Sequence, residues 1–441
     1  MKITKMSLVA ALLVGSSVYA DNDALKTITD SVKFDGNVNL FYGTIKSSDT
    51  VMYGTTGFSD KSKAKFFDKD SSAADASLNL ALSADLLKND YVTLSGKVAY
   101  TVLTTLGLEN SLVSNVWGSA HSATVKGGNH HYPAKVGTEN YFTEAYIAAT
   151  AGKTTAQIGR MELDTPLAFS EKWSAETNTF EAIALINQDI PDTTLVGAWI
   201  GNGNGTQDGL IDLETVGRVP LAFAGVVDTD GEFNTFGGDG AYAVGAVNNS
   251  WKPLTTQAWY YAVKNVANAL WLQADLNIDG ILAGAQFSNF DYDSHTGLDD
   301  NKVWAVMGGY KMKDVGAIKL AYSKVGDKEK GLSAAGYNVA TASGDTKLYT
   351  KTYWNYGMDV VTDNDARAYK VCASSPLDGW FDAMLSYTDV KSSTEDTRLK
   401  EIAVVAKKSF GPLDLSGAYL NVKRDDVARA HYLIAKIGLN F

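Results

Sequence analysis

Apolar and polar residues alternate with a period of two along many stretches of the chain. In residues 32–42, "VKFDGNVNLFY", the residues Val32, Phe34 and Leu40 fall on the same side of an extended strand. The same alternation recurs in residues 77–86, 270–277, 318–323 and 381–387. A period of two rather than 3.6 indicates β-strands, each with one apolar face and one polar face.

The segments between these strands alternate in length. Short turns such as "DG" (279–280) and "GP" (411–412) alternate with long polar segments. The long segments cover residues 43–75, 104–140, 162–177, 202–240, 291–301, 326–365 and 390–397. A transmembrane barrel has this asymmetry, with tight turns at its periplasmic rim and long loops outside. With brief outer loops near 264–267 and 424–428, the pattern predicts an all-β fold, a transmembrane antiparallel β-barrel of about eighteen strands.

A secreted β-sandwich or a soluble barrel would also contain alternating strands. In such a fold, long loops need not avoid every second connection. Aromatic residues near strand ends also favour the membrane barrel, because aromatic girdles lie at both membrane interfaces. These aromatic residues are Tyr42, Tyr91, Tyr100, Tyr310, Tyr322, Tyr387, Tyr419 and Phe441.

The first twenty residues predict a secretory signal peptide. Lys2 and Lys5 precede an apolar run that ends on small residues and is shorter than the roughly 18–20 residues of a spanning helix. Cleavage near Ala20 would leave residues 21–31 as a short periplasmic segment and residues 32–441 as one barrel domain. The predicted location is the bacterial outer membrane, with its lipid as a partner.

The last eleven residues, "HYLIAKIGLNF", alternate as well. Leu433, Ile437 and Phe441 fall on the face predicted to meet lipid, and Ile434 and Lys436 fall on the opposite, wet face. The net charge of −11 comes without a basic patch, so no nucleic-acid partner is expected.

Other chemistry is weakly indicated. "NHH" (129–131) lacks a third metal ligand at a telling spacing, and "DTDGE" (228–232) lacks the ligand order of an EF-hand. No cofactor is expected, although carboxylates in the outer loops could bridge a calcium ion. No catalytic set of Ser, His and Asp or of Cys and His stands in a recognisable context, so the protein is not expected to be an enzyme.

The chain resembles a known family of outer-membrane porins. Its export signal, its even number of strands and its terminal "GLNF" are similar to those of bacterial porins, and "IGRMELDTPLAFSEKWSAETNTFEAIAL" (158–185) is similar to the third loop and flanking strands of OprD-type porins. The overall layout resembles the Campylobacter-type major outer-membrane porins. The resemblance implies that the terminal Phe441 is an assembly signal and that the protein is a homotrimer.

In the porins that this chain resembles, the third loop folds into the lumen and narrows it. The resemblance therefore implies that residues 162–177 form the constriction, lined by Arg160, Glu162, Asp164, Glu171, Lys172 and Glu176. Arginine ladders of OprD-type channels have no counterpart here, because the arginines of this sequence are widely scattered.

Charged residues on the predicted wet faces form a mixed pore wall. They are Lys97, Glu144, Asp275, Lys319, Asp382, Glu401, Lys407 and Lys436. Because acidic linings favour cations, the sequence predicts a passive channel for small hydrophilic solutes and ions with a mild preference for cations. The alternatives are a barrel that acts mainly as a surface adhesin or structural protein, and a secreted β-rich glycan-binding enzyme.

Overall fold

A computed structural model describes most of the chain after residue 21. The described residues are 22–47, 65–68, 72–104, 106–107, 112–113, 116–117, 123–124, 139–172, 175–204, 234–235, 240–328, 334–340, 345–353, 360–392, 397–425 and 427–441. The predicted signal peptide and the segments 129–131 and 228–232 lie outside these residues.

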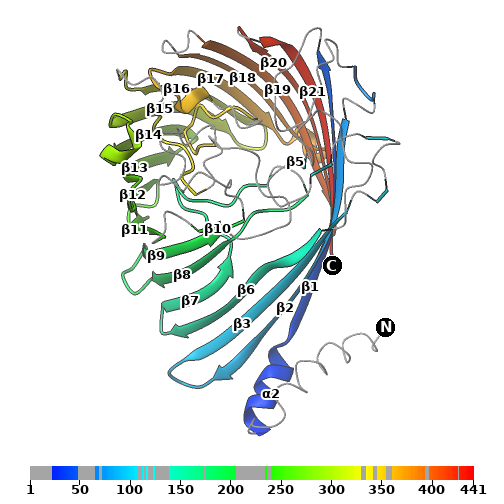
Figure 1. Cartoon of the computed structure of the whole chain (residues 1–441), viewed down its shortest axis with the longest axis vertical. Helices are drawn as coiled ribbons and strands as arrows, with labels where there is room; N and C mark the ends of the chain where they lie inside the picture. The colour runs from blue at the N-terminus through cyan, green and yellow to red at the C-terminus, as the bar shows by residue number, and fades with distance from the viewer. Residues whose placement is uncertain are drawn as a thin grey trace.

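Eighteen long strands form one closed antiparallel barrel, as the sequence predicts. Each strand pairs with the next long strand along the chain, and β21 pairs with β1 to close the ring (Figure 1). The strands are β1 (Lys33–Ser47), β2 (Ser72–Lys88), β3 (Thr93–Thr104), β6 (Glu139–Ala151), β7 (Thr154–Met161), β8 (Phe180–Asn187), β9 (Thr193–Gly203), β11 (Ala241–Asn248), β12 (Leu254–Val263), β13 (Ala267–Ile278), β14 (Ile281–Tyr292), β15 (Asn301–Met312), β16 (Gly316–Val325), β17 (Arg367–Ser375), β18 (Asp382–Ser392), β19 (Thr397–Phe410), β20 (Leu413–Arg424) and β21 (Val427–Asn440).

Shorter elements accompany the barrel. The two-residue strand β10 (Asn234–Thr235) pairs with β9, and β4 (Val116–Trp117) pairs with β5 (Ala123–Thr124) in a separate sheet. The helices are α2 (Asn22–Ser31), η2 (Ser294–Thr296), η3 (Val360–Thr362) and η4 (Leu377–Gly379). Among the described residues, none of the helices has the length and apolar character to cross a membrane.

The connections fall on two rims, as the alternation of their lengths predicts. We call the end of the barrel with the short connections the turn rim and the other end the loop rim. Asp279 and Gly280 connect β13 to β14 at the turn rim, and both have positive φ angles, 51° and 85°. A two-residue hairpin turn of type I′ needs positive φ at both positions, which explains why Asp-Gly stands there.

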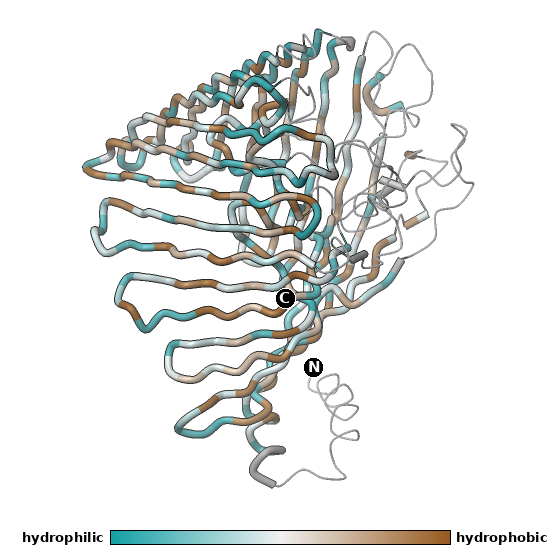
Figure 2. The backbone as a smooth tube through the Cα atoms, turned by 60° about the vertical axis from the view of Figure 1, so that its left-hand side comes forward, coloured by the Kyte–Doolittle hydropathy of each residue, from teal (hydrophilic) through white to brown (hydrophobic). Residues whose placement is uncertain are grey.

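The two faces of the strands differ in the way the alternation predicts. On β16, Ile318 and Leu320 lie on the outward row and are 49% and 57% exposed, whereas Ser323 on the inward row is fully buried. Figure 2 shows short hydrophobic and hydrophilic stretches following one another along the strands. An exposed apolar band around a closed cylinder matches a hydrocarbon environment.

Aromatic side chains gather near both rims of the barrel. Toward the loop rim, Trp304, Tyr322 and Tyr369 on three successive strands form a continuous cluster, with ring centroids 5.2 Å and 4.8 Å apart. Near the turn rim, Tyr91 and Trp380 are 85% and 79% exposed. This distribution corresponds to the two girdles expected at membrane interfaces.

Phe441 lies at the seam that closes the barrel. Its backbone N–H donates to the carbonyl of Gly36 and its carbonyl accepts from the N–H of Gly36, both at 2.9 Å. Its ring covers Gly36, where a Cβ atom would overlap it, and lies 6.5 Å from the ring of Phe34. The terminal aromatic residue therefore completes the pairing of β21 with β1, while its role as an assembly signal stays a prediction.

The inward row is not polar along the whole seam. Phe41, Leu420, Tyr432 and Ile434 form a buried apolar cluster on the lumen side of β1, β20 and β21, and Tyr353 from a lumen segment packs against it. The prediction of a wet face around Ile434 was therefore wrong. Local alternation identifies which residues point inward, but it does not show that another segment will cover them.

The helix α2 lies beside the turn rim (Figure 1). The Ser31 hydroxyl accepts a hydrogen bond from the backbone N–H of Asp85 at 2.8 Å, which ties the end of the helix to β2. Residues 21–31 were predicted only as a short periplasmic segment, and the structure describes a helix for most of that range.

The assignment of outward and inward rows can be tested on β19. Val404→Arg would place a charge on the apolar outer surface, so we expect a loss of about 2–4 kcal/mol in unfolding free energy if this residue lies near the bilayer midplane. Lys407→Leu, on the exposed part of the inward row, is the control and is expected within about 0.5 kcal/mol of the parent protein. Urea titrations in lipid vesicles measure both values; equal losses would contradict the assignment.

Candidate pore constriction

The described parts of two connections at the loop rim lie inside the lumen. The first, residues 162–179, connects β7 to β8, and the second, residues 326–366, connects β16 to β17. Both contact inward residues of the wall: the N–H of Leu167 donates to the Tyr261 hydroxyl at 3.2 Å, and Thr350 hydrogen-bonds Ser323 at 2.6 Å. Figure 1 shows described parts of the second segment, in yellow, inside the ring of strands. We call these segments the first and second lumen segments.

The first lumen segment begins with a tight hairpin. The N–H of Thr165 donates to the carbonyl of Ala168 at 3.0 Å, and the N–H of Ser170 donates to the carbonyl of Leu163 at 2.7 Å. Pro166 is well suited to the second position of this turn, because its ring fixes φ near the value that the position requires. The short sequence "TPLA" therefore turns the chain back as soon as it leaves the wall.

The buried amide of Asn338 joins the two lumen segments. Its Nδ2 donates to the carbonyl of Phe169 at 2.8 Å and to Oε1 of Glu171 at 2.6 Å, and its Oδ1 accepts from the N–H of Phe169 at 3.2 Å. A backbone bond from the N–H of Val339 to the carbonyl of Leu167, at 2.8 Å, lies beside it. One side chain thus satisfies donors and acceptors of both segments in a buried position.

An ion pair adds a second connection between the segments. Lys347 pairs with Asp164, and its Nζ also lies 4.9 Å from the centroid of the Phe169 ring. Asp164 is largely exposed in this pair. An exposed pair of this kind stabilises a protein little, so the buried amide of Asn338 is the stronger connection.

The second lumen segment is anchored to the wall through predicted pore residues. The Tyr349 hydroxyl donates to Asp275 on β13 at 2.6 Å, and the N–H of Tyr353 donates to Glu401 on β19 at 2.6 Å. Gln286 on β14 accepts from the N–H of Tyr349 at 3.0 Å and donates to the carbonyl of Lys347 at 2.9 Å. Asp275 and Glu401 therefore face inward, and they hold the inserted chain in place.

The predicted acidic lining divides into buried and exposed carboxylates. Glu171 and Glu176 are only 3% and 5% exposed. Glu176 accepts hydrogen bonds from Ser77 and, at 3.1 Å, from Asn39. Glu162 and Asp164 are exposed, so they are the acidic residues of the first lumen segment that meet lumen water directly.

Glu162 lies within the influence of several other charged groups. Partial desolvation of its carboxyl group raises its pKa, and the neighbouring Glu144 carboxylate acts in the same direction. Lys97 and Lys172 oppose this shift. Lys97 and Glu144 themselves form an ion pair across β3 and β6. Glu162 therefore faces a lumen wall of mixed charge.

A basic group stands on the seam side of the lumen. Lys436 on β21 donates to the carbonyl of Lys172 at 3.3 Å, and its Nζ lies 5.6 Å from the centroid of the Phe41 ring. Lys407 on β19 is exposed and is the register partner of Asp382 on β18, near the turn rim. Lys319 on β16 is also exposed on the inward row. All eight predicted wall residues thus lie on the inward row.

Arg160 is not brought together with the other predicted constriction residues. It continues the outward row of β7, next to the exposed Ile158, and its Nε donates to Glu181 on β8 at 2.8 Å. Asn202 on β9 donates to the same carboxylate at 2.6 Å. Arg160 and Glu162 are two residues apart, but the chain leaves the sheet between them, so strand parity no longer relates their directions.

Sequence reasoning missed the second lumen segment, which was predicted only as a long outer loop at residues 326–365. Its inward position depends on contacts with distant residues, which local periodicity does not report. A signal was nevertheless present: Tyr337, Val339, Val360 and Val361 are apolar residues in an otherwise polar connection. Three of them, Tyr337, Val360 and Val361, are buried in the structure.

Among the residues that the structure describes, no group of three or more His, Cys, Asp and Glu side chains is arranged to hold a metal ion. The acidic residues near the constriction are instead hydrogen-bonded to protein donors, as for Glu171 and Glu176.

No protein-family model matches the sequence, and no curated protein matches it. The fold, in contrast, matches solved structures of bacterial porins. OpdK of Pseudomonas aeruginosa, solved with vanillate, is 12% identical with a TM-score of 0.65, over 94% of this chain and 99% of that chain. OccAB4 of Acinetobacter baumannii is 12% identical with a TM-score of 0.66, over 93% and 98%. OccK9 (OpdG) of Pseudomonas aeruginosa is 13% identical with a TM-score of 0.65, over 94% and 100%.

The closed barrel of eighteen strands is the fold of these solved porin structures. Among porins, the chain has the OprD-type porin fold. The resemblance seen in residues 158–185 is thereby confirmed at the level of the fold.

Asn338→Ala tests the connection between the lumen segments. The substitution leaves the N–H and carbonyl of Phe169 and the Glu171 carboxylate without this partner, so we expect a loss of about 1–3 kcal/mol in stability. The loosened segments are expected to give a larger or noisier single-channel current in a planar bilayer. Asn268→Ala, an exposed amide on β13, is the control. A quiet current of unchanged size would show that Asn338 does not hold the constriction.

Proposed function

We propose that the protein is a channel of the bacterial outer membrane, through which small hydrophilic solutes and ions diffuse passively with a mild preference for cations. The observation that carries this proposal is the pair of lumen segments joined by Asn338 inside a closed barrel of eighteen strands. Barrels of 16 to 18 strands leave an aqueous channel, and segments fixed within it determine its narrowest cross-section.

The charge around the lumen segments supports the proposed cation preference. Glu162 and Asp164 meet water, and the carboxylates of Glu171, Glu176 and Asp345 lie behind them in buried positions. Acidic linings favour cations. Several lysines share the lumen and reduce this effect: Lys347 pairs with Asp164, Lys351 pairs with Asp345, and Lys172 is exposed. The preference is therefore expected to be mild.

Opposite charges on different sides of the lumen also favour polar solutes. Lys436 and Lys407 are on β21 and β19, whereas Glu162 leaves the wall beside β7. A field across the lumen orients dipolar solutes and penalises apolar ones. We infer no single natural solute from this arrangement, because its charges are distributed rather than gathered into one site.

Ion selectivity is expected to depend on pH through Glu162. Its raised pKa means that this carboxylate is charged above the folded-state pKa and is neutralised as the pH falls through it, earlier than an ordinary glutamate. Reversal potentials under a salt gradient, measured from neutral to acidic pH, are expected to show cation preference declining in that range.

Glu162→Gln is expected to lower cation preference at neutral pH and to move the remaining decline to more acidic pH. Asp382→Asn, an exposed carboxylate near the turn rim, is the matched control and is expected to have a smaller effect because it lies far along the strand from the lumen segments. Clear anion preference of the parent protein would defeat the charge argument.

We also propose that the protein assembles as a homotrimer, since the porins that its sequence resembles commonly do. Light scattering in detergent is expected to give three times the mass of the mature chain. Each insertion into a planar bilayer is expected to add three equal conductance steps. A single step per insertion together with a monomeric mass would refute this assembly.

A further inference from the structure

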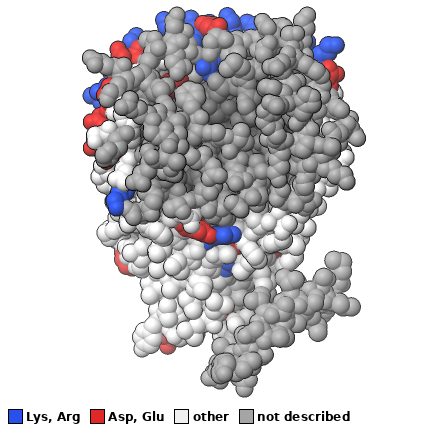
Figure 3. All heavy atoms as spheres, viewed as in Figure 1, with Lys and Arg blue, Asp and Glu red and all other residues white. Residues whose placement is uncertain are grey.

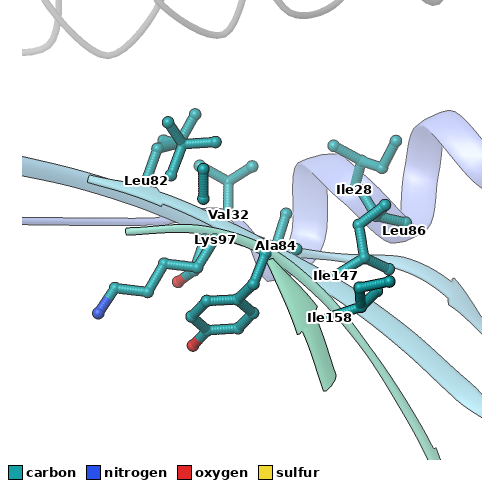
Figure 4. Close-up of a pocket in the computed structure, with 13 residues that line it drawn as sticks. Ile28, Val32, Leu82, Ala84, Leu86, Lys97, Ile147 and Ile158 are labelled. Atoms are coloured by element: carbon teal, nitrogen blue, oxygen red, sulfur yellow. The ribbon is translucent and has the colours of Figure 1, made fainter. Parts of the chain in front are cut away.

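A cavity of about 480 Å³ lies between α2 and the outer surface of the barrel near the turn rim. Ile28 and Val32 line its helix side, and Leu82, Val98, Ile147 and Ile158 line its wall side (Figure 4). These wall residues come from β2, β3, β6 and β7, four strands that lie side by side in the barrel. The cavity is therefore apolar on both sides.

The wall side of the cavity belongs to the outward row. Ile147 and Ile158 are register partners and are 49% and 55% exposed, and Val98 is 42% exposed. Lys97 points away from these residues in Figure 4 and pairs with Glu144 in the lumen. The cavity thus opens toward the surroundings of the barrel and has no part in the constriction.

The helix holds the cavity open from the turn rim. Its last residue, Ser31, hydrogen-bonds the backbone of Asp85 on β2 at 2.8 Å, and the N–H of Val32 donates to the carbonyl of Ile28 at 3.0 Å. These bonds fix the end of α2 against β2, while β6 and β7 curve away with the barrel. Ile28 therefore faces the outward isoleucines across a gap rather than in direct packing.

The surface around the cavity carries charges of both signs. Lys26, Lys33 and Lys88 are exposed, each one or two residues from a lining residue. Asp30 and Asp35 are also exposed, and Asp85 lies 3.9 Å from Lys88. In the view of Figure 3, the described surface of the lower part is otherwise mostly uncharged, and charged side chains gather toward the upper edge.

We propose that this cavity binds one acyl chain of a glycerophospholipid from the leaflet at the turn rim, with α2 as its clamp. This inference rests on the proposed membrane location of the barrel. Hydrocarbon is the medium that the outward row meets there, and water is unfavourable in a cavity with apolar walls. The exposed lysines and aspartates that neighbour its lining residues in sequence complement a zwitterionic headgroup, which carries both a phosphate and an amine.

A second copy of the chain fits this cavity less well. The outer wall of a barrel is convex and broad, whereas the cavity is a narrow recess covered by a helix. An amphipathic helix with its apolar side toward the acyl region and its charges at headgroup level is also a common membrane-interface arrangement. A single flexible hydrocarbon chain is the occupant that satisfies both the shape and the surroundings.

The test uses the full-length mature protein, purified in detergent and supplied with phosphatidylethanolamine. After exhaustive detergent exchange, native mass spectrometry is expected to detect one phospholipid retained per chain. Ala145→Phe fills the cavity from the outward row of β6, and retention is expected to fall at least tenfold. Ala373→Phe, on the outward row of β17 far from α2, is the matched control and is expected to retain the lipid. Loss of lipid from the parent protein, or equal retention by both variants, would overturn the proposal.

Photo-cross-linking identifies the occupant directly. A benzoylphenylalanine in place of Ile147 is expected to label a phospholipid, which supports the proposal. A cross-linked dimer would assign the cavity to a second copy, and an adduct with α2 itself would show that the cavity is closed; either result overturns the proposal. Because none of these substitutions faces the lumen, the conductance of the same preparations reports on the channel separately from lipid binding.

Discussion

The pairing of β21 with β1 is the interaction on which the rest of the structure depends. A sheet with free edges would leave rows of backbone N–H and C=O groups without partners, and in hydrocarbon each such group costs several kcal/mol. Residues 430–441 therefore close the sheet by pairing with β1. Phe441 exchanges two backbone hydrogen bonds with Gly36 and covers that glycine with its ring. Closure in turn fixes which row of every strand faces outward.

Closure also creates the space that the lumen segments occupy. Polar residues on the inward rows of the wall contact the second lumen segment. Asp275, Gln286 and Glu401 form hydrogen bonds with its backbone or side chains. That segment then presents Asn338 to the first lumen segment. The inserted chain is thus held by successive contacts from the wall inward, and neither lumen segment is held by its own residues alone.

Much of the barrel could be predicted from the sequence, because strand periodicity and turn chemistry are local. The alternation around Ile318 and Leu320 and the Asp279–Gly280 turn are read correctly without knowledge of any distant residue. The lumen was less predictable. Tyr432 and Ile434 fall on the inward row as expected, but a remote segment covers them, and Arg160 is separated from Glu162 by the point where the chain leaves the sheet. Such outcomes depend on contacts between residues far apart in the sequence.

The buried carboxylates have a structural role in the lumen. Glu171 and Glu176 were predicted as lining residues, yet their main contacts are hydrogen bonds from Asn338, Asn39 and Ser77. A carboxylate in a buried position needs such donors to offset the loss of its contacts with water. These two carboxylates therefore hold the inserted chain in place, whereas Glu162 and Asp164 are exposed. Because the hydrogen bonds that satisfy these carboxylates also join the lumen segments to each other and to the wall, the position of the inserted chain depends on one network.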